Sequence, residues 1–474
     1  MFAKIQRIHF VGIGGIGMSG IAEVLLTLGY RVSGSDLRRS PVTARLEQLG
    51  AQVFEGHRAE NVHGAEVVVT SSAIGKENPE VAEAHRLHVP VIQRAEMLAE
   101  LMRLKYGIAV AGMHGKTTTT SVVAAVLAAG GLDPTVVVGG RVDAMGSNAR
   151  LGTSQYLVAE ADESDRSFLK LSPILSVVTN IDREHMDCYR DMDDIERTFL
   201  EFMDRVPFYG MIVACNDNEA LRALLPRVKR RVVTYGKCDG SDFHIISHSA
   251  FNHNAGVRQR FEVSFKDRSL GQFELSVVGE HNVLNATAAI AVGVGLDIPI
   301  EKIREGVESF RGVDRRFHVK GRVNDILVVD DYGHHPTEIR ATLGAARQTA
   351  QSSNGRVHVI FQPHRYTRTF LLMDEFATAF PQADRVLVLE IYAASEQPIA
   401  GLSGLTLASK IRCANDRPAE FAASFTAAVD AVVAEARPGD LILTLGAGNV
   451  SQLGSQIVER LQARTPEGVV AGHS

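Results

Sequence analysis

Several features that would narrow the class of protein are scarce in this sequence. It has no tryptophan and only four cysteines, Cys188, Cys215, Cys238 and Cys413, which stand far apart without a C-x-x-C pair. This spacing argues against a disulfide framework and against a zinc site, and it predicts a protein of the reducing cytoplasm. No apolar stretch reaches the roughly 18 residues that a membrane helix needs, so we expect no membrane span.

An excess of basic charge is also missing. The net charge is −5 at pH 7, and lysine and arginine are scattered along the chain rather than clustered. A protein that binds nucleic acid or anionic lipid usually carries a basic face. We therefore expect small-molecule ligands and no nucleic-acid partner.

The length and the apolar pattern predict the architecture. A chain of 474 residues is long enough for three domains at roughly 150 residues each. Short apolar runs alternate with helical runs throughout, which predicts an α/β fold with parallel sheets. We place the boundaries at 1–106, 107–313 and 314–474. We expect a Rossmann-like first domain, a central ATPase-like domain with a phosphate-binding loop, and a doubly wound, Rossmann-like third domain.

The most informative segment is residues 111–120, Ala-Gly-Met-His-Gly-Lys-Thr-Thr-Thr-Thr. The apolar run 107–110 before it predicts a strand, and the alanine-rich run 121–129 after it predicts a helix. A glycine turn in this position offers backbone N–H groups and a positive helix end to phosphate. The usual spacing G-x-x-x-x-G-K-[ST] is not met, because its first glycine would fall at Val110. The predicted nucleotide-binding residues are Gly112, Met113, His114, Gly115, Lys116, Thr117 and Thr118, with Lys116 on the outer phosphates and the Thr117 hydroxyl on Mg²⁺.

A second glycine turn lies near the start of the chain. The strand 7–11, the run Gly-Ile-Gly-Gly-Ile-Gly at 12–17, the helical spacing of 18–28 and the strand 30–36 form a βαβ fingerprint. Its predicted ligand residues are Gly14, Gly15 and Gly17, with Asp36 placed to meet a ribose hydroxyl.

The glycine run at 12–17 leaves other interpretations open. The glycines can serve only the packing of helix on strand, and a nicotinamide dehydrogenase would carry the same fingerprint. A dehydrogenase would leave Lys116 without a task. A non-catalytic nucleotide switch would not need the polar strand ends of the third domain.

Side chains that suit a metal follow two predicted strands of the central domain, 156–160 and 175–180. The carboxyl ends of parallel strands share one edge of a sheet, so Glu160 and His185 are expected near Thr117, where the three can hold a metal. Mg²⁺ prefers oxygen ligands, and a histidine also suits Mn²⁺. The other acids of the turn after the strand 156–160 are equally well explained as solvated loop residues: Asp162, Glu163 and Asp165.

Two parts of the central domain stay open. Asn282 and Asn285 lie where an alanine-rich helix through Val294 begins, and either can cap the helix or read a base. Residues 236–275 carry shorter, alternating runs, which predict a small antiparallel insert. We assign this insert no chemistry.

The third domain repeats the strand–helix alternation, with strands expected at 326–330, 357–361, 385–389 and 441–445. Polar residues follow three of these strands. Arg365 and Arg368, after the second, are suited to clamp a carboxylate or a phosphate through bidentate contacts.

Together these segments resemble the Mur ligases, ATP-dependent enzymes of bacterial cell-wall synthesis that form peptide bonds, over essentially the whole chain. The most similar branch joins L-alanine to UDP-N-acetylmuramate. The motifs that carry the resemblance are GIGGIGMSG (12–20), GMHGKTT (112–118), EADESD (160–165), TNID with HMD (179–187), GEHNVLNA (279–286), DDYGHHPTE (330–338) and QPHRYTR (362–368).

The resemblance implies roles for the three domains and for individual residues. The first domain would bind the UDP-sugar, the second ATP with Mg²⁺ or Mn²⁺, and the third the amino acid. Lys116, His185, Arg365 and Arg368 would be catalytic, and the two asparagines would lie near adenine. The residues implied to bind the UDP-sugar or amino-acid substrate are Gly14, Gly15, Gly17, Asp36, Ser71, Ser72 and His335.

The implied reaction converts the muramyl carboxylate to an acyl phosphate, which the amine of L-alanine then attacks. A recycling ligase, which attaches a whole murein peptide to the same UDP-sugar, is the alternative within the family. Two residues depart from the family pattern, Glu184 where Asp is frequent and Ser395 where Gly is frequent. Residues 186–206 contain no lysine, so we predict no carbamylated lysine of the kind that several relatives carry.

Overall fold

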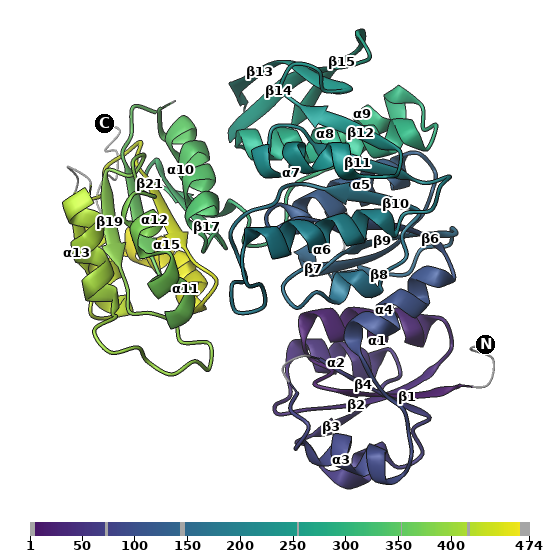
Figure 1. Cartoon of the computed structure of the whole chain (residues 1–474). Coiled ribbons are helices and arrows are strands. Elements are labelled where there is room, and N and C mark those ends of the chain that lie inside the picture. The colour runs from purple at the N-terminus through teal and green to yellow at the C-terminus, as the bar shows by residue number, and fades with distance from the viewer. Residues whose placement is uncertain are drawn as a thin grey trace, which may run out of the picture. The chain divides into compact units, whose positions relative to one another are not determined.

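The computed structural model describes residues 5–71, 74–142, 147–253, 256–351, 353–414 and 418–464. Three β-sheets, each with helices packed on it, are built in succession along the chain (Figure 1). None of the described helices is long and apolar enough to cross a bilayer. The expected α/β class with parallel sheets is confirmed.

The first sheet has five parallel strands in the order β3-β2-β1-β4-β5. Its strands are β1 (Arg7–Val11), β2 (Arg31–Asp36), β3 (Gln52–Glu55), β4 (Val67–Thr70) and β5 (Val91–Gln93). Its helices are α1 (Ile16–Thr27), α2 (Pro41–Gln48), the short 3₁₀ helix η2 (Ala59–Val62), α3 (Pro79–Arg86) and α4 (Arg94–Arg103). The helix α1 follows the first glycine turn directly, as the fingerprint predicts.

The central sheet has ten strands in the order β15-β14-β13-β12-β11-β10-β6-β9-β7-β8. These are β6 (Tyr106–Ala111), β7 (Thr135–Val142), β8 (Ser147–Arg150), β9 (Tyr156–Glu160), β10 (Leu175–Val178), β11 (Met211–Cys215), β12 (Val232–Gly236), β13 (Phe243–His253), β14 (Gly256–Phe265) and β15 (Arg268–Leu275). The helices are α5 (Lys116–Ala129), η3 (Ser167–Lys170), α6 (Met192–Asp204), α7 (Glu219–Leu224), η4 (Leu225–Arg227), α8 (Glu280–Gly295) and α9 (Ile300–Ser309).

One expectation about the central sheet needs correction. The helix after the phosphate loop begins at Lys116 and not at 121, so the four threonines occupy its first turns, where they are buried. Residues 236–275, expected to form a small antiparallel insert, contain the strands β13, β14 and β15. Their strands extend the central sheet, and β13 continues it from β12 in parallel, with Tyr235 opposite Phe243.

The third sheet has six strands in the order β16-β17-β21-β18-β19-β20, parallel except for β16 at one edge. The strands are β16 (His318–Val323), β17 (Ile326–Asp331), β18 (Val357–Phe361), β19 (Arg385–Val388), β20 (Ala419–Phe421) and β21 (Leu441–Leu445). The helices are α10 (Pro336–Gln351), α11 (Tyr366–Leu371), α12 (Met373–Ala377), α13 (Gly404–Ala414), α14 (Phe425–Glu435), η5 (Asn449–Gln452) and α15 (Leu453–Ala463).

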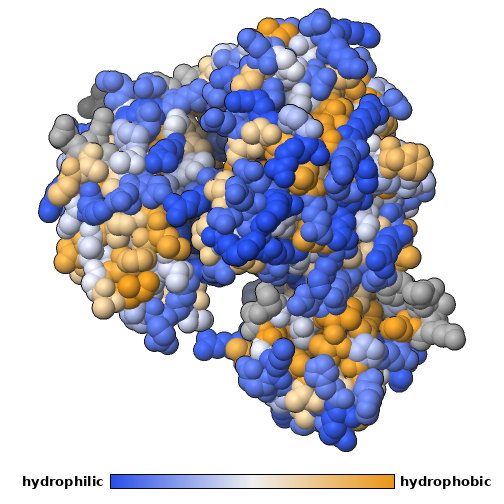
Figure 2. All heavy atoms as spheres, in the orientation of Figure 1, coloured by the Kyte–Doolittle hydropathy of each residue, from blue (hydrophilic) through white to orange (hydrophobic). Residues whose placement is uncertain are grey.

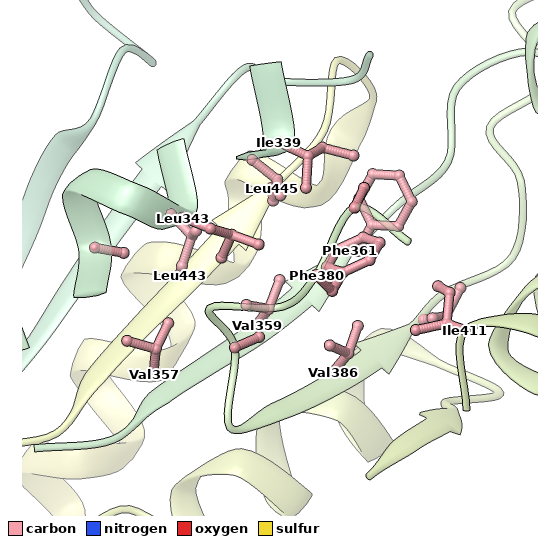
Figure 3. Packing of buried hydrophobic residues seen from close by; sticks show 14 of the residues in the cluster. Ile339, Leu343, Val357, Val359, Phe361, Phe380, Val386, Ile411, Leu443 and Leu445 are labelled. Carbon is pink, nitrogen blue, oxygen red and sulfur yellow. The ribbon is translucent and has the colours of Figure 1, made fainter. Parts of the chain in front are cut away.

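Apolar clusters cover both faces of the third sheet. Along β17, Leu327 and Val329 belong to one cluster, while Ile326 and Val328 belong to the other. Successive side chains of a strand point to opposite faces, so a strand buried on both sides is a nearly continuous apolar run, as β17 is before Asp330 and Asp331. Figure 3 shows the cluster on which α10 and α13 pack. The doubly wound arrangement expected for this domain is confirmed.

The chain divides into two compact units. The first comprises Met1–Ser249, Arg260–Leu275 and Val283–Val313, and the second comprises Ala250–Gln259, Ser276–Asn282 and Asp314–Ser474. All four cysteines are free, and Cys215 is buried at the end of β11. Figure 2 shows hydrophilic residues over much of the visible face, with apolar residues in separate patches.

Candidate functional site

The phosphate loop lies where three central strands end together. The strand β6 lies between β9 and β10, and all three run parallel, so their carboxyl ends share one edge of the sheet. Ligands of parallel α/β sheets bind at this edge. The loop 112–115 follows β6, the acidic turn after Glu160 follows β9, and the segment that leads to His185 follows β10.

The two glycines of this loop are required by its geometry. Gly112 and Gly115 have φ angles of +129° and +84°, which residues with a Cβ atom rarely adopt. A Cβ on Gly112 would lie 2.0 Å from the Thr179 hydroxyl oxygen, and one on Gly115 would lie 2.7 Å from Oδ1 of Asn285. The loop backbone therefore approaches its neighbours more closely than any side chain allows.

Hydrogen bonds tie the loop to the end of β10. The backbone N–H of His114 donates to Oδ1 of Asn180 at 2.9 Å, and the carbonyl of His114 accepts from the Thr179 hydroxyl at 2.6 Å. The His114 ring lies 3.0 Å from Asp182. These contacts hold the loop in shape, and its two glycine positions present only backbone atoms.

Lys116 occupies a different position from the one expected for a phosphate ligand. Its ammonium folds back over the loop and donates to the carbonyls of Gly112 at 2.7 Å and Met113 at 3.2 Å, and to Oε1 of Glu163 at 2.7 Å. Burial alone would lower the pKa of Lys116, but the charge and hydrogen bond of Glu163 outweigh it and raise that pKa. Lys116 is therefore firmly protonated.

Glu163 is the residue that the sequence argument missed. It was as well explained as a solvated loop acid, yet its side chain is 1% exposed and pairs with Lys116. His185 lies 3.5 Å from the same carboxylate oxygen. Burial would lower the pKa of His185, but Glu163 and then Glu184 outweigh it and raise that pKa. The only sequence signal was the place of Glu163 in the turn after a buried strand.

The remaining predicted residues of the nucleotide site belong to both compact units, three to the first and Asn282 to the second. Thr117 is buried in the first turn of α5, and Glu160 ends β9 opposite Val110 of β6. Asn285 accepts a hydrogen bond from the Thr119 hydroxyl at 3.1 Å. Asn282 belongs to the second compact unit, and its amide donates to the Val278 carbonyl. Helix α8 begins at Glu280, so neither asparagine is its N-cap, and the capping alternative is wrong.

The first glycine turn is arranged in another way. Gly12 has a φ of +80°, and the N–H groups of Gly12 and Ile13 donate to the Ser35 carbonyl. The Asp36 carboxylate, at the end of β2, accepts from the N–H of Gly14 at 2.9 Å. Asp36 therefore contacts the glycine turn itself, and its contact with a ribose hydroxyl stays a prediction.

Other predicted substrate residues of the first unit lie near this turn or outside the described chain. Gly15 precedes α1, and a Cβ on Gly17 would lie 2.9 Å from Nη1 of Arg94. Ser71 follows β4, and Ser72 lies outside the described residues. Arg94 donates to Asp162 at 3.1 Å, which links α4 to the acidic turn of the central sheet.

In the second unit, polar residues gather after the three adjacent strands β17, β21 and β18. Arg368 contacts the ring and the carbonyl of His364 at 3.2 and 3.3 Å. The His364 ring stacks on Tyr392 with ring centroids 5.6 Å apart. Burial, then the charges of His334 and the nearby arginines, lower the pKa of His364 to about 3, so the ring is neutral.

Two further predicted residues of this unit, Arg365 and His335, each lie directly before a helix. Arg365 has a φ of +70° and precedes α11, and its backbone N–H donates to the Tyr392 carbonyl. His335 is buried just before α10, and its Nδ1 accepts from the N–H of Thr337 at 3.3 Å. Arg365 thus lies just before the first turn of α11 and Arg368 within it, and Arg368 contacts His364.

The residues fit a nucleotide and a divalent cation. The glycine positions at 112 and 115 leave loop backbone open to phosphate without a side chain, and the helix end of α5 adds its positive dipole. Oε2 of Glu163 is buried and lacks a hydrogen-bond partner among the described residues. A buried carboxylate oxygen in that state suits a hard cation, and Thr117, Glu160 and His185 stay the predicted ligands.

Comparison with known proteins agrees with this site. The models of the Mur ligase family catalytic domain, the Mur ligase middle domain and the Mur ligase glutamate ligase domain match residues 7–106, 110–293 and 315–448. The chain belongs to the Mur ligase family.

Individual Mur ligases are similar over nearly the full length. The UDP-N-acetylmuramate–L-alanine ligase of Koribacter versatilis is 70% identical, over 98% of this chain and 99% of that protein. Among solved structures, the UDP-N-acetylmuramate–alanine ligase of Thermotoga maritima is 31% identical with a TM-score of 0.80, over 97% of this chain and 100% of that one. A murein peptide ligase from Psychrobacter arcticus reaches 26% and 0.68, over 97% and 100%.

Proposed function

We propose that this protein joins L-alanine to the carboxylate of UDP-N-acetylmuramate with ATP, through an acyl phosphate, and releases ADP and phosphate. The observation that carries the proposal is the glycine loop 112–115 with Lys116 and helix α5, at the strand edge that also carries Glu160 and His185. The names of the relatives at 70% and 65% identity supply the substrates. The product is a precursor of peptidoglycan, made in the cytoplasm.

In this proposal the charge of each group determines its role in the reaction. Loop amides and Lys116 neutralise the phosphates of ATP, and Thr117, Glu160 and His185 hold Mg²⁺ or Mn²⁺, which offsets charge on the transferred phosphoryl group. Asn282 and Asn285 lie near adenine in this proposal. Arg365 and Arg368 attract the carboxylate of alanine and the transferred phosphate.

The UDP-sugar is assigned to the first sheet. Gly14, Gly15 and Gly17 let the start of α1 approach a diphosphate, and Asp36 accepts from a ribose hydroxyl. Ser71 follows β4, and we also assign Ser72 to the substrate, while His335 contacts substrate from the third domain. We keep 1–106, 107–313 and 314–474 as the proposed substrate, ATP and amino-acid domains.

One assay tests the proposal. Phosphate release should require ATP, UDP-N-acetylmuramate and L-alanine together, and omission of any one should abolish it. A murein tripeptide in place of L-alanine tests the recycling alternative, which the lower similarity to the murein peptide ligase disfavours. Faster release with the tripeptide than with L-alanine would overturn the proposal.

A further inference from the structure

The ammonium of Lys116 has no hydrogen left for a phosphate. It carries three hydrogens, and three acceptors receive them: two loop carbonyls and Oε1 of Glu163. A phosphate oxygen that binds Lys116 must therefore replace one of these acceptors. The carbonyls belong to the loop that surrounds the phosphate, so the exchange falls on Glu163.

The position of Glu163 is fixed by its backbone. Its carbonyl accepts from the Tyr189 hydroxyl at 2.6 Å and from the N–H of Arg166 at 3.0 Å. The Arg166 guanidinium lies over the Tyr189 ring, 4.7 Å from its centroid, and pairs with Asp194. These contacts anchor the Glu163 backbone, which limits how far the carboxylate can follow Lys116 when the lysine moves toward a nucleotide.

Movement of the Lys116 ammonium toward a phosphate would leave the buried Glu163 carboxylate without its hydrogen-bonded cation. Its side chain is 1% exposed, and its Oε2 already lacks a hydrogen-bond partner within the described chain. A buried charge that loses its partner is strongly destabilising, because water cannot replace the lost contact. Among the ion pairs of the described residues, His185 would be the one partner left beside it, at 3.5 Å.

We propose that Glu163 is a positioning residue that couples nucleotide binding to metal binding. Glu163 retains Lys116 in the nucleotide-free enzyme and releases it to the phosphates only when a divalent cation replaces the ammonium beside Glu163 and His185. This inference rests on the proposed function, since it requires the loop 112–115 to bind the nucleotide. It explains why a phosphate-loop lysine is paired with a buried acid.

The test is nucleotide affinity with and without metal. ADP is titrated into the full-length protein by calorimetry, once with excess Mg²⁺ and once with a chelator, for wild type and for Glu163→Gln. The matched control is Asp165→Asn, the same carboxylate-to-amide change two residues away on an exposed side chain. Circular dichroism and thermal unfolding check that each variant is folded.

Glu163→Gln should bind metal-free ADP about tenfold more tightly, within the usual range of site couplings. Its affinity for ADP with Mg²⁺ should stay within about threefold of wild type or become weaker, so the gain from metal shrinks. Asp165→Asn should leave both affinities unchanged. Equal tightening in both conditions would show only a general charge effect and would overturn the proposal, as would unchanged metal-free affinity.

A second variant protects the test against misfolding of the first. Glu163→Asp keeps the charge but withdraws the carboxylate from Lys116, so it should strengthen metal-free ADP binding by a smaller factor. No change in a folded Glu163→Asp protein would contradict the proposal. Failure of wild type to bind ADP under either condition would instead contradict the nucleotide site itself.

Discussion

The two glycine turns of this chain look alike in sequence and differ in chemistry. Each follows a buried strand, opens a helix and begins with a glycine at positive φ, Gly12 or Gly112. In the first turn a partly exposed acid, Asp36, accepts from the loop backbone. In the second, a lysine covers the loop and pairs with a buried acid, Glu163.

The comparison teaches that a strand–glycine–helix motif specifies a backbone shape and not a task. Both turns expose amides at a helix start, which attracts phosphate in general. The charged side chains decide the rest. An anion beside the first turn suits hydroxyl groups of a sugar, whereas the cation of the second suits the phosphates whose charge changes during reaction.

The largest difference between the two turns should appear when the Lys116 ammonium is removed. Lys116→Ala should lower ligase activity by about 10²–10³ or more, because it removes a charge that stabilises the transition state. Binding of UDP-N-acetylmuramate, assigned to the first turn, should not change. Initial rates and calorimetry with the UDP-sugar measure the two effects. Activity within tenfold of wild type would contradict the assignment of the second turn.

The next largest difference is expected in stability, when the first glycine of each turn is replaced by alanine. A Cβ on Gly12 meets only Ile74 at 3.7 Å, whereas one on Gly112 meets Thr179 at 2.0 Å. Gly12→Ala should therefore destabilise the protein by about 1–2 kcal/mol, the cost of a left-handed residue. Gly112→Ala adds overpacking of about 1–3 kcal/mol. Urea denaturation compares the two, and equal losses would contradict the clash.

A buried acid of helix α3 should make the stability of the first unit depend on pH. Glu80 is fully buried and accepts from Ser35 and from Asn61, each at 2.6 Å. Burial would raise the pKa of Glu80, but the His9 ring and these two donors lower it to about 2. The unfolded pKa is near 4.5, so Glu80 stabilises the fold above that pH, by on the order of 3 kcal/mol.

That contribution should disappear as the pH falls from 4.5 toward 2. Glu80→Gln cannot titrate, so its free energy of unfolding should vary less with pH than that of wild type between about pH 3 and 5. Urea denaturation across this window measures the slope. Parallel pH profiles for the two proteins would show that Glu80 does not titrate differently on folding.

The smallest effect is expected at Asp36. Asp36→Asn keeps an acceptor for Gly14 but loses the charge, and a hydrogen bond to a neutral acceptor is weaker by about 1 kcal/mol. UDP-N-acetylmuramate should bind about fivefold more weakly, and the ADP affinity of the second turn should not change. Calorimetry with both ligands provides the check. An equal loss for ADP would remove the distinction between the turns.

Local patterns explain what could be predicted from the sequence. The strands β1, β9, β18 and β21 lie where apolar runs placed them, because a strand buried on both faces is a nearly continuous apolar run. The start of α5 was misplaced by five residues. Threonine is a weak helix former, and burial of Thr117–Thr120 overrides that local preference.

The parts of the site that escaped prediction depend on partners far apart in the chain. Glu163 pairs with a lysine 47 residues earlier, and His364 stacks on Tyr392. Neither pair has a local periodicity, and an acid in an acidic turn looks the same whether it is solvated or buried. Glu160 and His185, which stay predicted metal ligands, could be assigned to the same edge of the sheet as the loop because strand ends are local features.

The central place of β21 in the third sheet has a consequence for synthesis. This strand lies between β17 and β18 although it comes last in the chain. The ribosome makes β18 about 80 residues before it completes β21, a delay of roughly 4–16 s at 5–20 residues per second. During that interval β17 and β18 have unpaired inner edges, which are the surfaces that chaperones shield and that aggregation exploits. The third domain therefore keeps two strand edges open to unwanted pairing until β21 is complete.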